Sequence, residues 1–371
     1  MNTFQQLGIR KDLIKGLKDL GIVNPTQIQE ETIPQLLSNA TDFIGLAPTG
    51  TGKTAAYGLP ILQDIEIENK VIQALILAPT RELAQQIKKQ LFKFTKHVDG
   101  KIFTEEVYGG EKINIQIANL KRPTHIVVAT PGRLLDLIER GSLDLKHIKT
   151  LVLDEADEML SMGFKEDLDK ILKYTGTSKK TWLFSATMPT ELNQLIKKYM
   201  SPKAIKVEPN GNQVNSNITH QYISVSRTDK DDALLKFLDQ HQQERGIIFS
   251  RTKAGAQKLT KFLKEEGFSV DALEGNMQQR DREKVMRAFK KGSLQYLVST
   301  DVSARGIDVN NLAFVLHYQL PESLAYYTHR SGRTARGGNS GISIALILPH
   351  ELPEVKQIEK SLNIKFKQKT L

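Results

Sequence analysis

The 371-residue chain contains no cysteine. This absence excludes disulfide bonds and zinc sites built on thiolates, and it agrees with a reducing compartment. The chain also lacks any run of roughly 20 apolar residues, so we expect no membrane-spanning segment. Residues 1–4 lack the basic start and apolar stretch of a secretory signal peptide, and we therefore expect a cytoplasmic protein. The eight histidines show no spacing typical of metal ligands.

Positive charge is in excess. Lys and Arg number 52 against 42 Asp and Glu, which gives a formal net charge of +10. Such a surface attracts phosphate backbones or anionic membranes, and charge alone does not choose between them. Because a domain takes roughly 100–200 residues, the length indicates two domains.

Short apolar runs alternate along the chain with segments of helical period. This pattern is typical of strand–helix–strand units and predicts an α/β protein with mainly parallel sheets flanked by helices. Each run is too short for a buried helix. The expected strands include Ala74–Ala78, Ile126–Ala129, Leu151–Leu153, Trp182–Phe184, Ile247–Phe249, Tyr296–Val298 and Phe314–His317.

One polar segment interrupts this pattern. The run EPNGNQVNSN, from Glu208 to Asn217, is rich in Pro, Gly, Asn and Ser and has no periodicity, so it is interpreted as a linker. It divides the chain into an N-terminal domain of residues 1–208, a linker of residues 209–217 and a C-terminal domain of residues 218–371. The same alternation on both sides predicts two similar α/β domains.

The string APTGTGKT has the composition of a phosphate-binding loop. A glycine-rich turn between a strand and a helix lets backbone N–H groups approach phosphates, while its lysine reaches the outer phosphates and its threonine hydroxyl binds Mg²⁺. A flexible surface turn is the alternative, but the apolar stretch Phe43–Ala47 before it argues against that. The predicted ATP-binding residues are Ala47, Pro48, Thr49, Gly50, Thr51, Gly52, Lys53 and Thr54.

The apolar run TLVL is followed directly by the acids of DEAD. Phosphoryl transfer to water needs one carboxylate to organise the metal and a second to take a proton from the attacking water. Asp154 suits the first role, acting on Mg²⁺ through water together with Thr54, and Glu155 suits the second. The sequence therefore predicts a nucleoside triphosphatase.

Polar clusters also follow several of the other apolar runs. Ligands of open parallel sheets collect beyond the carboxyl ends of the strands, so the repetition of such clusters predicts a site along one edge. Any single cluster is more often a turn or a helix cap, and it is the repetition that favours a site. The clusters are Pro79–Glu82, Thr130–Arg133, Asp154–Glu155, Ser185–Thr187, Ser250–Arg251 and Thr300–Asp301.

Taken together and in order, these motifs resemble those of the DEAD-box ATP-dependent RNA helicases. The resemblance extends from Phe4 to about Ile347 and includes APTGTGKT, PTRELA, TPGR, DEAD, SAT, STDVSARGID and HRSGRTAR. It implies two tandem RecA-like domains joined by a short linker, ATP with Mg²⁺ as cofactor, and RNA as partner.

The resemblance also assigns an adenine-recognition segment within residues 4–29. Its ATP-binding positions are Phe4, Ile22, Thr26 and Gln29. The amide of Gln29 would read the adenine edge, since it offers both a donor and an acceptor, and ATP would be preferred over GTP. A role for Gln29 in capping the local helix is the open alternative. Ile22 stands where the family often has an aromatic residue, so aliphatic packing would replace base stacking.

Catalytic and coupling positions carry over in the same way. Besides Lys53 and Glu155, Arg333 and Arg336 resemble the arginines that stabilise the transferring phosphoryl group, although HRSGRTAR could instead be a plain RNA-binding patch. Gln279 and Arg305 would orient the attacking water, His329 would link the arginines to the DEAD segment, and Gly306 and Asp308 would bind the nucleotide, Asp308 at its ribose. The residues implied in coupling are Asp157, Ser185 and Thr187.

Predicted RNA contacts occur in both domains. Hydroxyls, arginines and glycine backbone suit phosphates and 2′-OH groups, so binding should be sequence-independent and weakened by salt. Taken singly, Arg81 or Arg133 could be a surface ion pair, and Gly109–Gly110 a turn. The positions are Thr80, Arg81, Gly109, Gly110, Thr130 and Arg133, then Arg251, Gly275, Arg282 and Thr300.

The resemblance therefore implies an ATP-dependent RNA helicase, expected to act as a monomer, that closes two domains around ATP and RNA and opens short duplexes. Three alternatives share some of these motifs. An ATP-gated RNA clamp or scaffold would bind without productive unwinding, and a DNA helicase of the same superfamily would share the architecture. A small-molecule kinase leaves the second domain unexplained.

Overall fold

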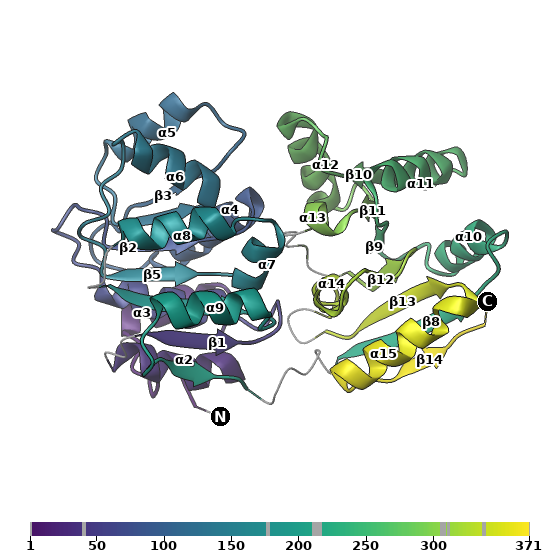
Figure 1. The fold of residues 1–371 in the computed structure, drawn as a ribbon, viewed down its shortest axis with the longest axis horizontal. Helices are drawn as coiled ribbons and strands as arrows, with labels where there is room; N and C mark the ends of the chain where they lie inside the picture. The colour runs from purple at the N-terminus through teal and green to yellow at the C-terminus, as the bar shows by residue number, and fades with distance from the viewer. Residues whose placement is uncertain are drawn as a thin grey trace. The chain divides into compact units, whose positions relative to one another are not determined.

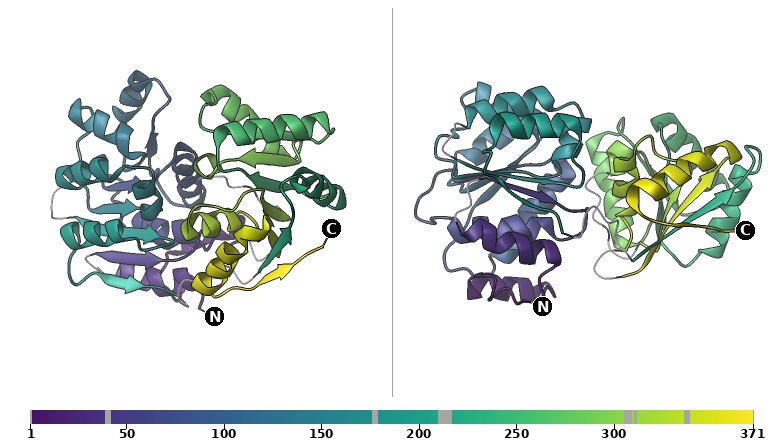
Figure 2. Two further views of the ribbon diagram at one scale, coloured as in Figure 1. Left: turned by 45° about the vertical axis from the view of Figure 1, so that its right-hand side comes forward. Right: turned by 60° about the horizontal axis from the view of Figure 1, so that its bottom comes forward.

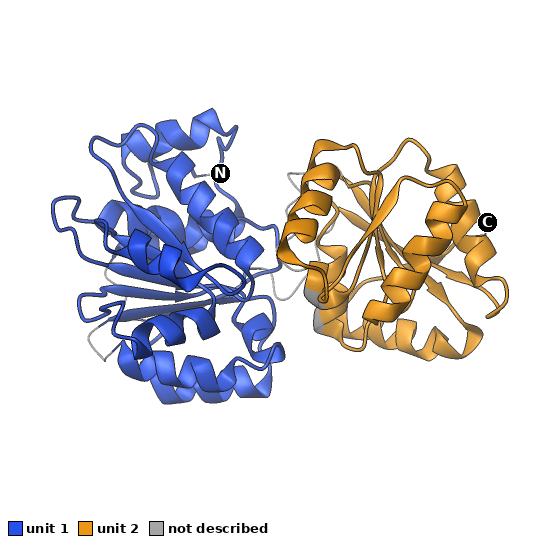
Figure 3. Ribbon diagram, turned by 90° about the horizontal axis from the view of Figure 1, so that it is seen from above, with its two compact units in different colours: residues 1–212 blue, residues 213–371 orange. Residues whose placement is uncertain are grey.

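The chain forms two compact units, Met1–Asn212 and Gln213–Leu371 (Figure 3). This computed structural model describes residues 2–38, 42–175, 179–209, 217–304, 309, 312–335 and 339–370. Residues 210–216 of the expected linker lie outside the described residues. We call the two parts unit 1 and unit 2.

Unit 1 is built on a seven-stranded parallel sheet with the strand order β3-β4-β2-β5-β6-β1-β7. Its central strands are buried along their whole length, because helices cover both faces of the sheet (Figures 1 and 2). The strands are β1 (Phe43–Leu46), β2 (Ala74–Leu77), β3 (Thr104–Val107), β4 (Ile126–Ala129), β5 (Thr150–Leu153), β6 (Lys180–Ser185) and β7 (Ile205–Val207).

The helices of unit 1 pack in two layers. Apolar side chains of helices α1, α2, α3 and α4 pack on one face of the sheet. Those of helices α6, α7, α8 and α9 pack on the opposite face. The helices are α1 (Lys11–Asp19), α2 (Gln27–Leu37), α3 (Lys53–Asp64), α4 (Arg81–Phe94), α5 (Ile113–Leu120), α6 (Pro131–Glu139), α7 (Ala156–Ser161), α8 (Lys165–Tyr174) and α9 (Thr190–Tyr199).

Unit 2 repeats this architecture. Its seven parallel strands follow the order β10-β11-β9-β12-β13-β8-β14, which becomes the order of unit 1 when the strands are counted from the start of each unit. The strands are β8 (Ile218–Ser224), β9 (Gly246–Phe249), β10 (Val270–Leu273), β11 (Tyr296–Ser299), β12 (Phe314–His317), β13 (Gly341–Ile347) and β14 (Phe366–Gln368).

Helices also cover both faces of the second sheet (Figure 2). Apolar side chains of α10 and α11 pack on one face, and those of α12, α14 and α15 pack on the other. The helices are α10 (Lys230–Gln240), α11 (Lys253–Glu265), α12 (Gln279–Lys291), α13 (Asp301–Ala304), α14 (Leu324–Ser331) and α15 (Leu352–Leu362), with a 3₁₀ turn at Pro349–Glu351.

The predicted fold class, two similar α/β units with parallel sheets flanked by helices, is confirmed. All seven strands named from the sequence are present, with ends that differ by at most two residues. Among the described residues, no helix has the length and apolar character needed to cross a bilayer.

Candidate active site

The phosphate loop connects β1 to α3. Gly50 and Gly52 adopt left-handed φ angles of 82° and 94°, which other residues rarely adopt. A Cβ atom at Gly52 would also lie 2.3 Å from Nε2 of Gln29. The loop is closed by a 2.8 Å hydrogen bond from the Thr51 hydroxyl to the carbonyl of Pro48. The glycines are therefore needed for both the shape of the loop and its contact with α2.

Lys53 is the first residue of α3, and its side chain is buried. Its Nζ donates to the carbonyl oxygens of Ala47 at 2.7 Å and Pro48 at 3.3 Å. The ammonium thus lies inside the loop, next to the free backbone N–H groups at the start of a helix. This combination of a cation and a helix N-terminus suits an anionic phosphate.

Asp154 follows the carboxyl end of β5 and is 3% exposed. Its Oδ2 accepts a 2.8 Å hydrogen bond from the Tyr57 hydroxyl, and its Oδ1 accepts one of 3.0 Å from the backbone N–H of Glu155. Burial and the neighbouring Glu155 carboxylate raise the pKa of Asp154 to about 6, and Lys53 opposes that rise. A buried carboxyl group of this kind is typical of a functional site.

Glu155 is held in an uncommon backbone conformation. Its φ of 51° lies in the left-handed region, where few residues other than glycine occur. It immediately precedes α7, and its side chain is also buried. Strained backbone conformations of this kind concentrate at functional sites, because they hold a side chain in a direction that a relaxed backbone would not give it.

The residues Thr54, Asp154 and Glu155 fit a divalent cation that takes most of its ligands from water and phosphate. Two adjacent buried carboxylates repel each other, and a nearby dication relieves that repulsion. Among the described residues there is no group of three or more His, Asp or Glu side chains placed to hold a metal ion alone. Mg²⁺ commonly binds one or two protein oxygens and takes its other ligands from water and phosphate. Asp154 and Thr54 match that pattern.

The segment predicted to recognise adenine contacts the predicted phosphate loop directly. The Thr26 hydroxyl donates to the carbonyl of Thr51 at 2.8 Å, and Gln29 Nε2 donates to that of Gly52 at 3.0 Å. Gln29 Oε1 accepts from the backbone N–H of Thr26 at 3.0 Å, so Gln29 does cap α2. Phe4 is 2% exposed in the hydrophobic core, and Ile22 packs against the same cluster.

The three residues assigned to coupling lie together. The Asp157 carboxylate accepts hydrogen bonds from the backbone N–H of Thr187 at 2.9 Å and from its hydroxyl at 2.7 Å. The Ser185 hydroxyl accepts from the backbone N–H of Asp157 and donates to the carbonyl of Thr187. A movement of the loop after β6 would therefore be transmitted to α7, and the reverse.

The predicted RNA residues of unit 1 occupy the starts of two helices and one loop. Thr80 caps α4, and its hydroxyl accepts from the backbone N–H of Leu83. Thr130 lies at the corresponding position of α6. Gly109 and Gly110 follow β3 in an exposed turn, as the alternative interpretation allowed.

Both arginines of this group have contacts within unit 1, and Arg133 also forms the ion pair that the alternative allowed, with its Nε 4.0 Å from Oδ2 of Asp136. The Arg81 guanidinium lies over the ring of Tyr108, 4.7 Å from its centroid. Arg133 Nη1 donates to the carbonyl of Glu111 and to Oε1 of Gln116, both at 3.1 Å. Contacts of this kind hold each side chain in place next to the glycine turn.

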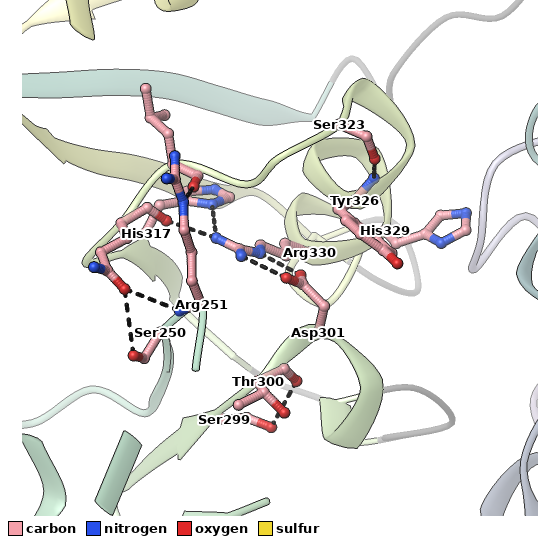
Figure 4. Close-up of polar contacts among 12 residues, drawn as sticks. Ser250, Arg251, Ser299, Thr300, Asp301, His317, Ser323, Tyr326, His329 and Arg330 are labelled. Carbon is pink, nitrogen blue, oxygen red and sulfur yellow. Dashed lines mark hydrogen bonds and ion pairs between the residues drawn. The ribbon is translucent and has the colours of Figure 1, made fainter. Parts of the chain in front are cut away.

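In unit 2 the predicted RNA residues follow β9, β10 and β11 (Figure 4). Arg251 donates through its backbone N–H to Oε1 of Gln319 and through Nε to the carbonyl of Leu320. Thr300 donates to the hydroxyl of Ser303, and Arg282 Nη2 donates to the Ser303 carbonyl at 2.9 Å. Gly275 lies next to the Lys253 side chain, where a Cβ would approach Lys253 Cε to 3.0 Å.

A buried arginine that the sequence prediction missed connects these segments. Arg330 is 1% exposed, and its Nε and Nη2 donate to both carboxylate oxygens of Asp301 at 2.5 and 2.7 Å. Its Nη1 donates to the carbonyl of Gln319 at 2.7 Å. The neighbouring His317 imidazole is neutral, because burial and the Arg330 charge lower its pKa. Arg330 lies within HRSGRTAR, but nothing in that string distinguishes a buried arginine from one that binds ligand.

The remaining catalytic predictions fall on α12, α14 and the segments that follow. Gln279 opens α12 and donates to Glu283 at 2.9 Å. His329 projects from α14 away from the Arg330 cluster (Figure 4). Arg333 is buried just after α14, with Nε donating to the carbonyl of His329 at 3.2 Å. Predicted residues outside the described part of the chain are Arg305, Gly306, Asp308 and Arg336.

Family models match both units. Residues 26–195 match a model described as DEAD/DEAH box helicase, and residues 229–338 match one described as helicase conserved C-terminal domain. The DEAD-box ATP-dependent RNA helicase CshA of Geobacillus kaustophilus is 40% identical over 99% of this chain and 78% of its own length. The ATP-dependent RNA helicase CshA of Limosilactobacillus reuteri is 42% identical over 98% of this chain and 72% of its own.

Solved structures of similar fold extend over the full chain. Dbp5 of S. cerevisiae bound to RNA and ADP BeF3 superposes with a TM-score of 0.90 at 31% identity, covering 100% of this chain and 96% of that one. Mss116p bound to ssRNA and AMP-PNP superposes with a TM-score of 0.87 at 31% identity, covering 100% and 80%.

Proposed function

This chain belongs to the DEAD-box family of ATP-dependent RNA helicases, and we propose that its two units divide the work of hydrolysing ATP and holding RNA. Unit 1 binds the nucleotide and activates the attacking water, while unit 2 stabilises the charge that develops on the phosphoryl group. The observation that carries this proposal is the buried arrangement of Lys53 and Asp154, which brings a cation and a pKa-shifted carboxyl group to the same end of the sheet.

ATP binding begins at the phosphate loop. Lys53 exchanges its two carbonyl partners for phosphate oxygens, a change that replaces neutral acceptors by charged ones and strengthens the hydrogen bonds. Backbone N–H groups at the start of α3 bind the same phosphates. The other loop residues from Ala47 to Thr54 supply the close backbone approach.

Gln29 reads the adenine edge without giving up its capping role. A side-chain amide has two N–H donors and two acceptor positions, and the contacts with Thr26 and Gly52 use one of each. The remaining donor and acceptor match the adenine edge. Ile22 packs against the base from one side, and ATP is preferred over GTP.

The Thr54 hydroxyl and, through water, the Asp154 carboxylate would hold Mg²⁺. When bound, it neutralises charge on the phosphates and positions them for attack. Glu155 accepts a proton from the attacking water. Tyr57 and the backbone N–H of Glu155 keep the Asp154 carboxylate in a fixed orientation while this happens.

The arginine that follows α14 stabilises the transition state of phosphoryl transfer. Arg333 donates to the phosphoryl group as negative charge builds up, a contribution on the order of 10³–10⁵ in rate for such residues. Its partners in the same task are assigned by resemblance. They are Arg336 as the second arginine, Gln279 and Arg305 for the attacking water, His329 for the link to the DEAD segment, and Gly306 and Asp308 for the nucleotide.

RNA is bound through its sugar-phosphate backbone by both units. The groups assigned to this contact are hydroxyls, arginines and glycine turns, which suit phosphates and 2′-OH groups, so binding is largely sequence-independent. They are Thr80, Arg81, Gly109, Gly110, Thr130, Arg133, Arg251, Gly275, Arg282 and Thr300.

Because ATP and RNA each bind residues of both units, each favours the same closed arrangement and each increases the affinity for the other. A strand held in that arrangement separates from its complement, and hydrolysis then releases it. Asp157, Ser185 and Thr187 couple the nucleotide to this change. We expect the protein to act as a monomer in the cytoplasm.

The substitution Glu155→Gln tests the assignment. RNA-stimulated ATP hydrolysis should collapse while ATP binding, measured by calorimetry, survives, because the amide preserves shape but cannot accept the proton. Glu191→Gln, at an exposed position of the same unit, is the matched control and should hydrolyse ATP normally. Unchanged turnover in Glu155→Gln would remove this residue from its role. Comparing RNA with DNA as stimulant separates an RNA helicase from a DNA helicase.

A further inference from the structure

Helix α12 carries a row of cations on the side that faces away from the core. Its buried side chains, Val285, Met286 and Phe289, pack against the sheet of unit 2. The opposite side presents basic residues at positions i, i+4, i+7 and i+11, which lie in line along one face of a helix. We call this the α12 basic face, and its members, all exposed, are Arg280, Lys284, Arg287 and Lys291.

The cations of the α12 basic face have no partner in the part of the chain that the structure describes. Among the described residues, no hydrogen bond or ion pair joins any of these four side chains to another group. The acidic neighbour Glu283 accepts from Gln279 instead. Some exposed lysines elsewhere are paired with acidic groups, such as Lys96 with Asp19 and Lys198 with Asp169. Like charges at i and i+4 disfavour a helix by themselves, whereas a polyanion lying along them removes that repulsion.

The net positive charge of the chain lies mainly in the unit that carries this face. Unit 1 has 28 Lys and Arg against 25 Asp and Glu, whereas unit 2 has 24 against 17. Within unit 2, residues 251–300 hold 11 basic against 6 acidic residues. The positive net charge therefore belongs mainly to unit 2, and α12 itself holds six basic against two acidic residues.

The α12 basic face begins where the proposed RNA contacts of unit 2 are. The first turn of α12 holds Arg282, which hydrogen-bonds the carbonyl of Ser303, and Ser303 in turn accepts from Thr300. Arg280 lies in the same turn. From there the helix runs for about 18 Å to Lys291, along the side of the sheet where β10 is the edge strand (Figure 1).

We propose that the α12 basic face is an accessory RNA-binding surface, which continues from Arg282 and holds the phosphates of RNA beyond the segment bound by the residues assigned above. This inference rests on the proposed function. The face presents Arg and Lys without aromatic side chains, so it binds the backbone and does not select sequence. Its role is to add affinity for long RNA or RNA with a flanking duplex.

The test compares two variants with equal loss of charge. The basic-face variant changes Arg280→Gln, Lys284→Gln, Arg287→Gln and Lys291→Gln. The control variant removes four exposed lysines near the opposite edge of the same sheet, on α10, α15 and β14. Its changes are Lys236→Gln, Lys356→Gln, Lys360→Gln and Lys367→Gln. Thermal unfolding of both establishes that they fold.

RNA affinity is measured across salt concentrations for strands of about 8 and about 30 nucleotides. For the long RNA, we expect the basic-face variant to bind about tenfold more weakly and its slope of log K against log salt to be smaller by about 3. The control variant should match the wild type, and all three proteins should bind the short strand equally.

Equal slopes for the two variants with long RNA would overturn the inference. The inference would also be overturned if the basic-face variant lost binding to anionic phosphatidylserine vesicles while its RNA binding was unchanged, because the face would then bind a membrane surface. If the short strand did not stimulate ATP hydrolysis by the wild-type protein, the proposed function would be refuted instead. The two failures are therefore distinguishable.

Discussion

The Tyr57 hydroxyl donates a 2.8 Å hydrogen bond to Oδ2 of Asp154. The phenol is completely buried in α3, behind the phosphate loop, and burial followed by the Asp154 charge raises its pKa well above the usual value. It therefore remains a neutral donor at physiological pH. Helix α3 thus fixes the position of the carboxylate that follows β5.

The substitution Tyr57→Phe keeps the ring and removes this donor. We expect the free energy of unfolding to fall by about 1–2 kcal/mol, since a buried carboxylate loses one of its two hydrogen bonds. The Mg²⁺ concentration needed for half-maximal ATP hydrolysis should rise by about three- to tenfold. Denaturant titration and a Mg²⁺ titration measure the two effects. Tyr174→Phe, at an exposed position, is the control and should change neither; a Tyr57→Phe enzyme with unaltered Mg²⁺ dependence would refute the positioning role.

Asp154 should make stability depend on pH in the protein without nucleotide or metal. Its pKa rises from 3.8 to about 6 on folding, so the protonated form is favoured in the folded state. Below about pH 4 the group is protonated in both states and has no effect. Between about pH 4 and 6 the unfolded chain ionises first, and by pH 7 the cost of the buried charge reaches about 2–3 kcal/mol.

Asp154→Asn should therefore stabilise the protein at pH 7 by up to about 2 kcal/mol, with the gain vanishing below pH 4, although it abolishes hydrolysis. Thermal unfolding in the presence of EDTA, repeated across this range, measures the difference. Asp99→Asn, an exposed change of the same kind, provides the baseline. If the stability of Asp154→Asn and that of the wild type changed with pH in the same way, the raised pKa of Asp154 would be contradicted.

Arg330→Lys should destabilise unit 2 selectively. A lysine cannot reproduce the two-pronged contact with Asp301 and also reach the Gln319 carbonyl, so a buried charge loses partners. We expect a loss of about 2–3 kcal/mol, seen as an earlier denaturant transition for unit 2 while that of unit 1 is unmoved. Arg140→Lys, at an exposed ion pair with Asp136, should leave both transitions in place. A shift of both transitions by Arg330→Lys would show that the contact is not confined to unit 2.

Thr187→Val should separate the two activities. The change keeps the shape of the side chain but removes the 2.7 Å hydrogen bond from its hydroxyl to Asp157. We expect RNA-stimulated ATP hydrolysis to persist while strand separation on a short duplex falls sharply. Thr190→Val, at an exposed position three residues away, should separate strands like the wild type. If both activities fell in proportion, the coupling role would be wrong.

Sequence patterns predicted the fold because the central strands are buried on both faces. Runs such as Ile126–Ala129 and Phe314–His317 are apolar throughout and too short for helices, so they predict strands almost to the residue. Edge strands carry polar residues and were not named. Examples are Thr104–Val107, with the sequence TEEV, and Phe366–Gln368.

Sequence patterns did not predict the residues that support the site. Tyr57 lies in the apolar stretch AAYGLP, which predicts an ordinary core residue. Asp301 and Arg330 are 29 positions apart, so only the fold brings them together. Gln29 was expected either to read the base or to cap α2, and the capping contact is present while base reading stays a prediction.

The central claim is that ATP and RNA each engage both units and therefore strengthen each other's binding. The most direct test measures RNA affinity with and without a non-hydrolysable ATP analogue at fixed Mg²⁺ and salt. We expect the analogue to tighten RNA binding by about tenfold or more, and RNA to tighten analogue binding by the same factor. Equal RNA affinity in the two conditions would contradict the account.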